Sequence, residues 1–227
     1  MKTIDLNIDL AEGGPWDREL LNICTTANIC CGAHAGSAEL ALETAEICKV
    51  KGVRICAHPG YEDRENMGRI NRLMGDDIAS VAPLLSEIAV QLQNVPDAVC
   101  LKPHGAFYHQ TGHEPRFAAI LQTVLIRLKL DLIGFPVGLH RETATKAGVR
   151  FISEGFVDRK YGEDGRLLAR TIPGSVIESL EESVEQAIRL AGQVDTLCLH
   201  SDTPGCVETA AEIRVALENA GYRVAAD

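Results

Sequence analysis

Ile4-Asp5-Leu6-Asn7-Ile8-Asp9-Leu10 is a segment in which apolar and polar side chains alternate from end to end. Successive side chains of a β-strand point to opposite faces, so the segment predicts a strand with one apolar and one polar face. If the apolar face packs against helices, Asp5, Asn7 and Asp9 point into the interior of a barrel. Buried carboxylates and amides are costly unless they are paired or bind a ligand, so this polar face is a candidate site. A half-exposed edge strand would show the same alternation.

Strand-like and helical patterns alternate along the rest of the chain. Such alternation predicts an α/β protein with a mostly parallel sheet covered by helices. Seven such units favour one domain over residues 1–227, a closed or nearly closed parallel (β/α) barrel of about seven strands, over an open doubly wound sheet. Strands are expected near residues 3–10, 26–31, 53–58, 98–104, 131–135, 149–156 and 196–200. Helices are expected near residues 15–24, 37–51, 78–94, 114–129, 138–147, 178–193 and 204–221.

The composition argues against several functional classes. A formal net charge of −10 disfavours nucleic acid and anionic membranes as partners, because both are bound by clusters of Lys and Arg. No apolar run approaches the roughly 18 residues of a membrane span, and the chain begins with strand-like residues rather than a signal sequence. Eight cysteines occur without a C-x-x-C pair, which indicates buried free thiols in a reducing cytosol. We therefore expect a cytoplasmic protein that acts on a small molecule.

Four of the seven histidines are expected at the carboxyl ends of strands, beside glycine or proline: His34, His58, His104 and His200. Ligands of parallel α/β proteins bind at these ends. One histidine there would more often be structural, but four on different strands that converge on one face favour a functional site. The neighbouring glycines leave room for a ligand to approach the backbone.

The same strand ends carry other side chains suited to acid–base chemistry. A neutral imidazole acts as a general base, and a carboxylate positions or protonates a reacting group. Lys102 would stabilise a developing oxyanion if it is partly desolvated. Asp158 and Arg159 follow the sixth strand, and they either form a structural ion pair or grip a substrate carboxylate in bidentate fashion.

Several well-known site motifs are absent from the sequence. It has no H-E-x-x-H, and His109 to His113 spans a glycine, so a helical zinc pair is not expected. It has no G-x-x-x-x-G-K-[ST] or G-x-G-x-x-G loop to cradle a nucleotide, and no G-x-S-x-G nucleophile elbow. A dispersed set of Asp and His is still able to bind a divalent metal, for which the candidates are Asp9, His34 and His58.

Short segments that lie mostly at strand ends follow one another in a specific order over nearly the whole chain. They are Asp5–Gly13, Ala27–Gly36, Ala57–Tyr61 with Gly68 and Arg69, Lys102–Tyr108, Asp158–Tyr161 with Asp164 and Gly165, Arg170 with Pro173 and Gly174, and His200–Gly205. Each segment alone is a weak signal, but the ordered set is highly specific. It resembles the family of 5-oxoprolinase A subunits, also called the LamB/YcsF lactam-utilisation family.

The resemblance implies an incomplete (β/α) barrel of the glycoside hydrolase/deacetylase type. It also implies ATP-dependent opening of 5-oxoproline, a lactam, to L-glutamate, shared with two partner subunits, B and C. A five-membered lactam is a stable amide, so coupling its hydrolysis to ATP is chemically sensible. Because the chain lacks a phosphate loop, we expect the partners to do much of the nucleotide work. The sequence leaves association into a homo-oligomer open.

Under this hypothesis the strand-end residues take definite roles. Asp9 or His58 activates water for attack on an activated carbonyl. Lys102 and His104 stabilise the carbonyl oxygen. The residues expected to bind substrate are Asp5, Asn7, His34, Asp158, Arg159 and His200.

Two other functions fit the same residues. The barrel type and the Asp/His set would also suit a metal-dependent deacetylase or a related hydrolase. The third hypothesis is a carrier or regulatory subunit that binds a small acid and does no chemistry. The chain departs from the residues usual in the family at positions beside the pocket, which are Ala11, Ala33, Ser37, His109 and Ser201.

Overall fold

The structure of the protein is a computed structural model that describes residues 2–73 and 81–226. Its strands are β1 (Lys2–Leu10), β2 (Thr26–Cys30), β3 (Arg54–His58), β4 (Cys100–Leu101), β5 (Asp131–Gly134), β6 (Phe151–Phe156), β7 (Thr196–His200) and β8 (Tyr222–Val224). Its helices are α1 (Asp17–Leu20), α2 (Ala38–Lys51), α3 (Val81–Leu92), α4 (Gly105–His113), α5 (Pro115–Leu128), α6 (His140–Ala147), α7 (Leu180–Leu190) and α8 (Cys206–Asn219).

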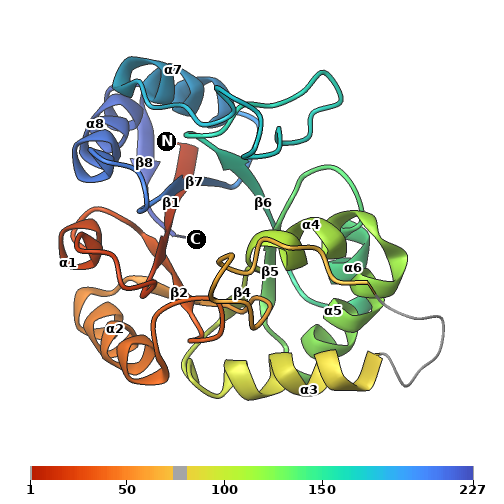
Figure 1. Cartoon of the computed structure of the whole chain (residues 1–227). Coiled ribbons are helices and arrows are strands. Elements are labelled where there is room, and N and C mark those ends of the chain that lie inside the picture. The colour runs from red at the N-terminus through yellow and green to blue at the C-terminus, as the bar shows by residue number, and fades with distance from the viewer. Residues whose placement is uncertain (1, 74–80, 227) are drawn as a thin grey trace.

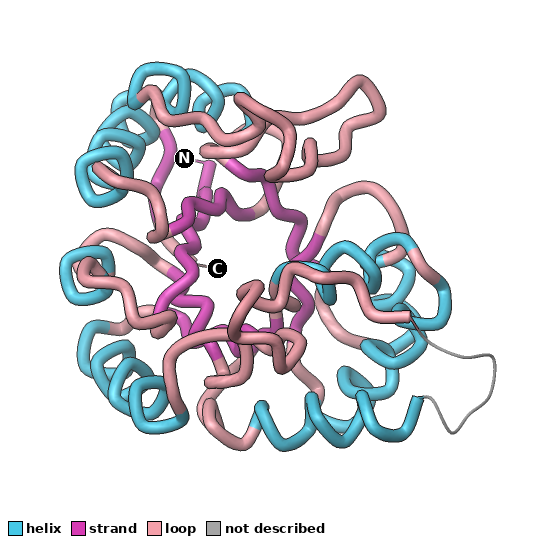
Figure 2. Tube along the Cα trace, viewed as in Figure 1, coloured by secondary structure: helices cyan, strands magenta, loops and turns pink. Residues whose placement is uncertain are grey.

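A ring of parallel strands forms the centre of the molecule, and the helices surround it (Figure 1, Figure 2). The sheet order is β2-β3-β4-β5-β6-β7-β1-β8, and β1 also pairs with β2, so the strands from β1 to β7 close into a barrel. The short β8 pairs only with the first residues of β1. The predicted parallel α/β barrel is therefore confirmed. It is incomplete in strand number, since the common barrel has eight strands, but it is closed.

Every predicted strand and helix corresponds to an element of the structure, with two additions. The start of the helix predicted at 78–94 lies outside the described residues. β4 is shorter than predicted because Pro103, which has no N–H, interrupts its ladder. Helix α4 was not predicted, because Gly105 and Gly112 lower its helix propensity. β8 was not predicted either, because so short a strand is recognisable only by its pairing with β1.

The opening strand β1 is buried on both faces. The apolar side chains from Ile4 to Leu10 are fully buried in the main hydrophobic core. The polar side chains of Asp5, Asn7 and Asp9 are at most 4% exposed. β2 and β7 flank the strand on its two sides. The alternation therefore marks a central barrel strand, and the edge-strand explanation is wrong.

All eight cysteines are buried free thiols, as predicted. Burial raises the pKa of the Cys48 thiol to about 12, so its reactive thiolate form is scarce at neutral pH. Within residues 2–73 and 81–226, none of the helices combines the length and the apolar character that crossing a bilayer requires.

The loop after β2 touches the loop after β1 at Gly36. This glycine has a φ of 56°, and a Cβ added to it would overlap the carbonyl oxygen of Ala11. We expect Gly36→Ala to lower the free energy of unfolding by about 2–4 kcal/mol in urea denaturation, through backbone strain and overlap together. Gly52→Ala is the matched control, because Gly52 has a φ of 69° and open space around it. Equal losses for the two variants would show that the contact with Ala11 contributes nothing.

Candidate active site

The polar face of β1 meets polar side chains of other strands inside the barrel. Asp9 lies opposite Asn28 on β2 and opposite His200 on β7. Asn28 donates hydrogen bonds to Asn7 Oδ1 at 2.6 Å and to Asp9 Oδ1 at 2.8 Å. Ser201, one of the departures from the family, donates to the backbone carbonyl of Asp9 at 2.8 Å. Asp9 is therefore fixed in position from two neighbouring strands.

Lys102 places a buried positive charge at the centre of this cluster. Its Nζ lies 2.8 Å from Asp9 Oδ1, 2.9 Å from Glu154 Oε1 and 3.0 Å from Cys198 Sγ. Burial alone would lower the pKa of Lys102, but Asp9, Cys198 and Glu154 together raise it well above its usual value. Lys102 therefore stays protonated at neutral pH and acts through its charge rather than as a base.

The carboxyl group of Asp9 is ionised, because its neighbours outweigh the effect of burial on its pKa. Burial would raise its pKa, but the neighbouring His58, Lys102 and His200 hold that pKa well below its ordinary value. Its second oxygen, Oδ2, lies 3.3 Å from His58 Nε2 and 3.8 Å from His200 Nε2. A carboxylate with so low a pKa is a weak base, which makes Asp9 better suited to positioning than to proton abstraction.

His200 and Asp158 form a pair at the edge of the cluster. Asp158 Oδ2 lies 2.8 Å from His200 Nδ1 and accepts a hydrogen bond from the His200 backbone N–H at 2.9 Å. Although burial opposes ionisation, the interactions with His200 lower the pKa of Asp158. An ionised Asp158 accepts a hydrogen bond from Nδ1–H, so in the neutral ring the lone pair is on Nε2, which faces Asp9. The His200 side chain is 14% exposed, more than the other polar groups around Asp9.

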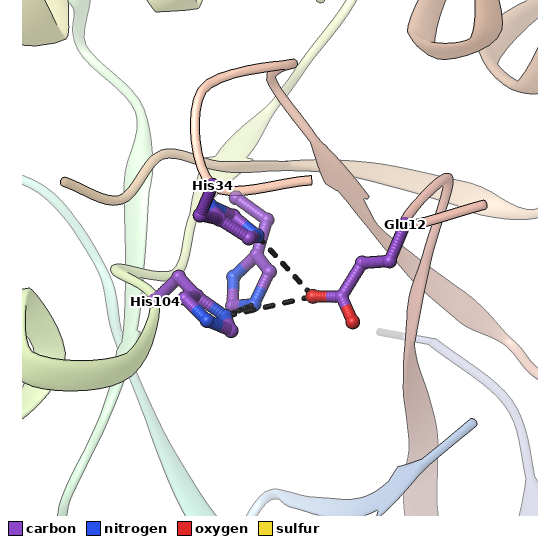
Figure 3. A group of neighbouring side chains, drawn as sticks. Glu12, His34 and His104 are labelled. Carbon is purple, nitrogen blue, oxygen red and sulfur yellow. Dashed lines mark hydrogen bonds and ion pairs between the residues drawn. The ribbon is translucent and has the colours of Figure 1, made fainter. Parts of the chain in front are cut away.

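Three histidines and Glu12 form a second group beside Asp9 (Figure 3). The rings of His34 and His104 stack with their centroids 3.7 Å apart, and the His58 ring stands perpendicular to them. Burial opposes a charge on His34, but the neighbouring Cys30 and Glu12 raise its pKa to about 9. Burial and the neighbouring His34 and His58 hold the pKa of His104 well below its usual value.

Asp5 does not join either group, although it was predicted to bind substrate. It lies at the opposite end of the barrel, where its carboxylate accepts hydrogen bonds from the hydroxyls of Thr25, Thr26 and Thr196 at 2.6–2.8 Å. These bonds satisfy the buried carboxylate without a ligand. The geometry therefore gives Asp5 a structural place rather than a place in the site.

Arg159 is buried beside two further arginines. Arg69 and Arg170 each reach Asp202 Oδ2, at 3.0 and 3.1 Å. Burial and the nearby charge of Arg170 lower the pKa of Arg159 to about 10. Its Nε is buried without a hydrogen-bond partner. Among the described residues no ion pair joins Arg159 to Asp158, so the structural ion pair considered above is not formed.

Sequence reasoning missed several members of the site. Asn28 and Glu154 lie within predicted strands and Glu12 directly after one, and this position was the available signal. One helix, α4, carries both His109 and His113 and continues through the glycine between them, which the sequence did not predict. Their rings lie 5.4 and 5.6 Å from the ring of Phe135, outside the two groups of possible metal ligands found in the described chain.

Two hollows of the surface lie away from this site. One of about 460 Å³ is lined by residues that precede β2 and β3 and follow β8, at the opposite end of the barrel. A smaller one of about 60 Å³ adjoins Asp5 and Arg54. Neither is lined by a histidine. The chemistry of the side chains therefore locates the candidate site, at the end where ligands of parallel barrels bind.

Comparisons with known proteins agree with this arrangement. The model of the LamB/YcsF family matches residues 4–226. The chain belongs to the LamB/YcsF family. Its relatives in this family include the 5-oxoprolinase A subunit of Streptomyces avermitilis, 38% identical over 98% of this chain and 99% of that protein. The 5-oxoprolinase A subunit of Neisseria meningitidis serogroup B is 36% identical, with both chains covered completely. The resemblance inferred from the sequence is confirmed.

Solved structures extend the comparison. A lactam utilization protein from Thermus thermophilus matches with a TM-score of 0.85 and 31% identity over 100% of both chains. A family 4 carbohydrate esterase from Streptomyces lividans matches with a TM-score of 0.53 and 12% identity, over 98% of this chain and 91% of that one. This second likeness concerns the fold alone. The alignment with the Streptomyces avermitilis relative spans 252 positions, so that relative has segments that the 227 residues here lack.

Proposed function

We propose that this chain is the ring-opening subunit of an ATP-dependent 5-oxoprolinase, which converts the lactam 5-oxoproline to L-glutamate. The relatives of the chain are named as A subunits of 5-oxoprolinase, which supports 5-oxoproline as the substrate. The observation that carries the chemistry is the Asp158–His200 pair, whose free imidazole nitrogen faces the fixed carboxylate of Asp9. An oriented imidazole beside a carboxylate is a common arrangement for activating water.

In this proposal His200 is the general base. Its Nε2 and Asp9 Oδ2 are 3.8 Å apart, too far for a hydrogen bond with each other, so both can hydrogen-bond the same water molecule. His200 takes a proton from that water as its oxygen attacks the lactam carbonyl. The ring C–N bond then breaks, and the leaving nitrogen takes the proton from the His200 imidazolium. Asp158 stabilises the imidazolium that forms. The base is thus His200 rather than Asp9 or His58, and Asp9 orients the water.

Lys102 contributes a fixed positive charge to the reaction. Its Nζ holds Asp9 on one side and Glu154 on the other, which keeps the Asp9 carboxylate oriented toward His200. The charge also lowers the energy of negative charge that develops on the attacked carbonyl oxygen. The surrounding side chains are buried, so this electrostatic effect is stronger than it would be at the surface.

The arginines bind the carboxylate of the substrate. Arg159 has a buried Nε without a partner, and Arg69 and Arg170 are held near it by Asp202. A guanidinium presents parallel N–H groups that match a carboxylate. We expect Arg159→Met to raise the KM for 5-oxoproline by roughly 10-fold to 100-fold, because a charge-assisted hydrogen bond is lost. Arg159→Lys should give a smaller increase. An unchanged KM in steady-state assays of Arg159→Met would remove this residue from the binding site.

ATP and two partner subunits complete the proposal. The amide of a lactam is stable, so ATP would activate its carbonyl before water attacks. The sequence of this chain has no phosphate loop, which supports assigning most of the nucleotide binding to subunits B and C. The eight unpaired cysteines suit a reducing compartment, so we place the reaction in the cytoplasm.

The proposal is tested by mixing the purified chain with its B and C partners, ATP and 5-oxoproline. Glutamate should appear only when all the proteins are present. A preparation that binds 5-oxoproline but leaves glutamate release by B and C unchanged would favour a carrier or regulatory subunit instead. Release of acetate from an acetylated sugar by the chain alone would favour the deacetylase hypothesis.

A further inference from the structure

Glu12, His34, His58 and His104 bring four potential metal ligands to one point. One ligand atom from each lies within 4.8 Å of the others (Figure 3). The four residues come from different parts of the barrel: the loops after β1 and β2, the end of β3, and the segment after β4. Four donors from four chain segments form a compact pocket only because the strands converge at this end.

Backbone carbonyls fix which nitrogens face this pocket. His58 Nδ1 lies 2.7 Å from the carbonyl oxygen of Lys102, and His104 Nε2 lies 2.8 Å from that of Met67. A carbonyl oxygen only accepts, so both ring nitrogens must donate. When both rings are neutral, the lone pairs of the other two nitrogens, His58 Nε2 and His104 Nδ1, face each other at 3.0 Å. Two lone pairs at this distance repel unless a proton or a metal ion lies between them.

The other two donors point to the same place. Glu12 Oε1 lies 3.2 Å from His34 Nε2 and 3.6 Å from His104 Nδ1. The His34 ring is fully buried, so its Nε2 is held beside Glu12 rather than in water.

Glycine backbone makes room for the rings. A Cβ added at Gly60 would lie 2.7 Å from His34 Nδ1 and 3.1 Å from His104 Cβ. A Cβ added at Gly68 would lie 3.0 Å from His34 Cβ. Side chains at these two positions would therefore displace the stacked histidines. Glycine at these two positions therefore leaves the space that the histidine rings occupy.

We propose that Glu12, His34, His58 and His104 bind one divalent transition-metal ion, with Zn²⁺ as the best match. Three imidazole nitrogens and one carboxylate oxygen suit the tetrahedral preference of Zn²⁺, which would displace the proton that Glu12 stabilises on His34. Hydrogen bonds from the outer ring nitrogens to carbonyl oxygens are typical of metal-ligating histidines. Four protein ligands leave no open position, so the ion would hold the four segments together rather than activate water. The inference does not depend on the lactam chemistry proposed above.

The second group of potential ligands, Asp9, Cys198 and His200, carries no such proposal. The ammonium of Lys102 lies 2.8 Å from Asp9 Oδ1 and 3.0 Å from Cys198 Sγ. This fixed positive charge already neutralises the group and would repel a metal ion placed among the same atoms.

The proposal is tested with the chelator-treated full chain and Zn²⁺ alone. We expect one equivalent of Zn²⁺ to bind in isothermal titration calorimetry and to raise the melting temperature, since a ligand of the native state stabilises it. Co²⁺ in place of Zn²⁺ should give the intense visible absorption of a tetrahedral site. Neither readout requires catalytic activity.

Substitutions of the proposed ligands test where the Zn²⁺ ion binds. Glu12→Gln and His104→Gln should each weaken Zn²⁺ binding about tenfold or more. His113→Gln is the matched control and should bind as the wild type does, since His113 lies outside the group. Glu12 is partly exposed, so Glu12→Gln should fold even if His104→Gln does not, and circular dichroism checks this. Failure of the wild type to bind one equivalent, or an unchanged affinity for Zn²⁺ in folded Glu12→Gln, would overturn the proposal.

Discussion

His200→Gln is expected to lower the kcat for glutamate release by about 10²–10⁴-fold, the usual contribution of a general base. Glutamine has no titratable nitrogen, so it can hydrogen-bond the water but cannot accept its proton. The KM for 5-oxoproline should change little, because the substrate is held by other groups. Steady-state assays with the B and C partners measure both constants.

Two further variants control this prediction. His113→Gln replaces a histidine of α4 that lies outside the site, and its kcat should equal that of the wild type. Asp158→Asn should also lower kcat strongly, because the amide no longer favours the tautomer with a proton on Nδ1 and no longer stabilises the imidazolium. A His200→Gln protein with more than a tenth of the wild-type kcat would exclude His200 as the base.

Lys102→Met is expected to lower the free energy of unfolding by about 3–5 kcal/mol at neutral pH. The substitution leaves the buried carboxylates of Asp9 and Glu154 without their shared positive partner. Urea denaturation monitored by circular dichroism measures the loss. Lys146→Met is the matched control, because Lys146 pairs with Glu142 on the surface of α6, and its loss should stay below about 0.5 kcal/mol. Equal losses for the two variants would contradict the account.

The cost of Lys102→Met should depend on pH. In the wild type the pKa of Asp9 is held well below its ordinary value, so its contribution to stability is present above the unfolded pKa of about 3.9 and is lost as pH falls through the lower folded pKa. Without Lys102, the pKa of Asp9 is higher than in the wild type, because burial is opposed by fewer neighbours. The cost of the variant is therefore largest where Asp9 is ionised in both proteins. The difference in free energy of unfolding between variant and wild type should shrink as pH falls through the folded pKa of Asp9 in the variant.

Much of this site could be predicted from the sequence, because strand periodicity determines the face on which a side chain lies. The alternation of β1 placed Asn7 and Asp9 inside the barrel, and the glycine-flanked histidines marked the strand ends. Periodicity does not determine depth along the barrel axis. Asp5 shares a face with Asp9 but lies about 13 Å from it along the strand, at the strand rise of about 3.3 Å per residue. For this reason its predicted role in substrate binding does not match its position.

The remaining site residues depend on contacts between distant segments. Glu12 and Glu154 are ordinary carboxylates in the sequence, and only the closed barrel brings Glu154 to Lys102. Arg69 and Arg170 meet at Asp202, a contact that no local pattern indicates. The sequence segments that identified the family contain most of these residues. Their sequence alone does not show which of these side chains are in contact.

The most direct test of the central claim compares ATP consumption with glutamate release in one reconstituted mixture. The B and C partners are supplied with ATP, 5-oxoproline and either the wild-type chain or His200→Gln. If this chain opens the activated ring, the wild type should release glutamate in step with ATP consumption. With His200→Gln, ATP should still be consumed while glutamate release falls by about 10²-fold or more. Glutamate released at the wild-type rate by the His200→Gln mixture, or by the partners alone, would contradict the account.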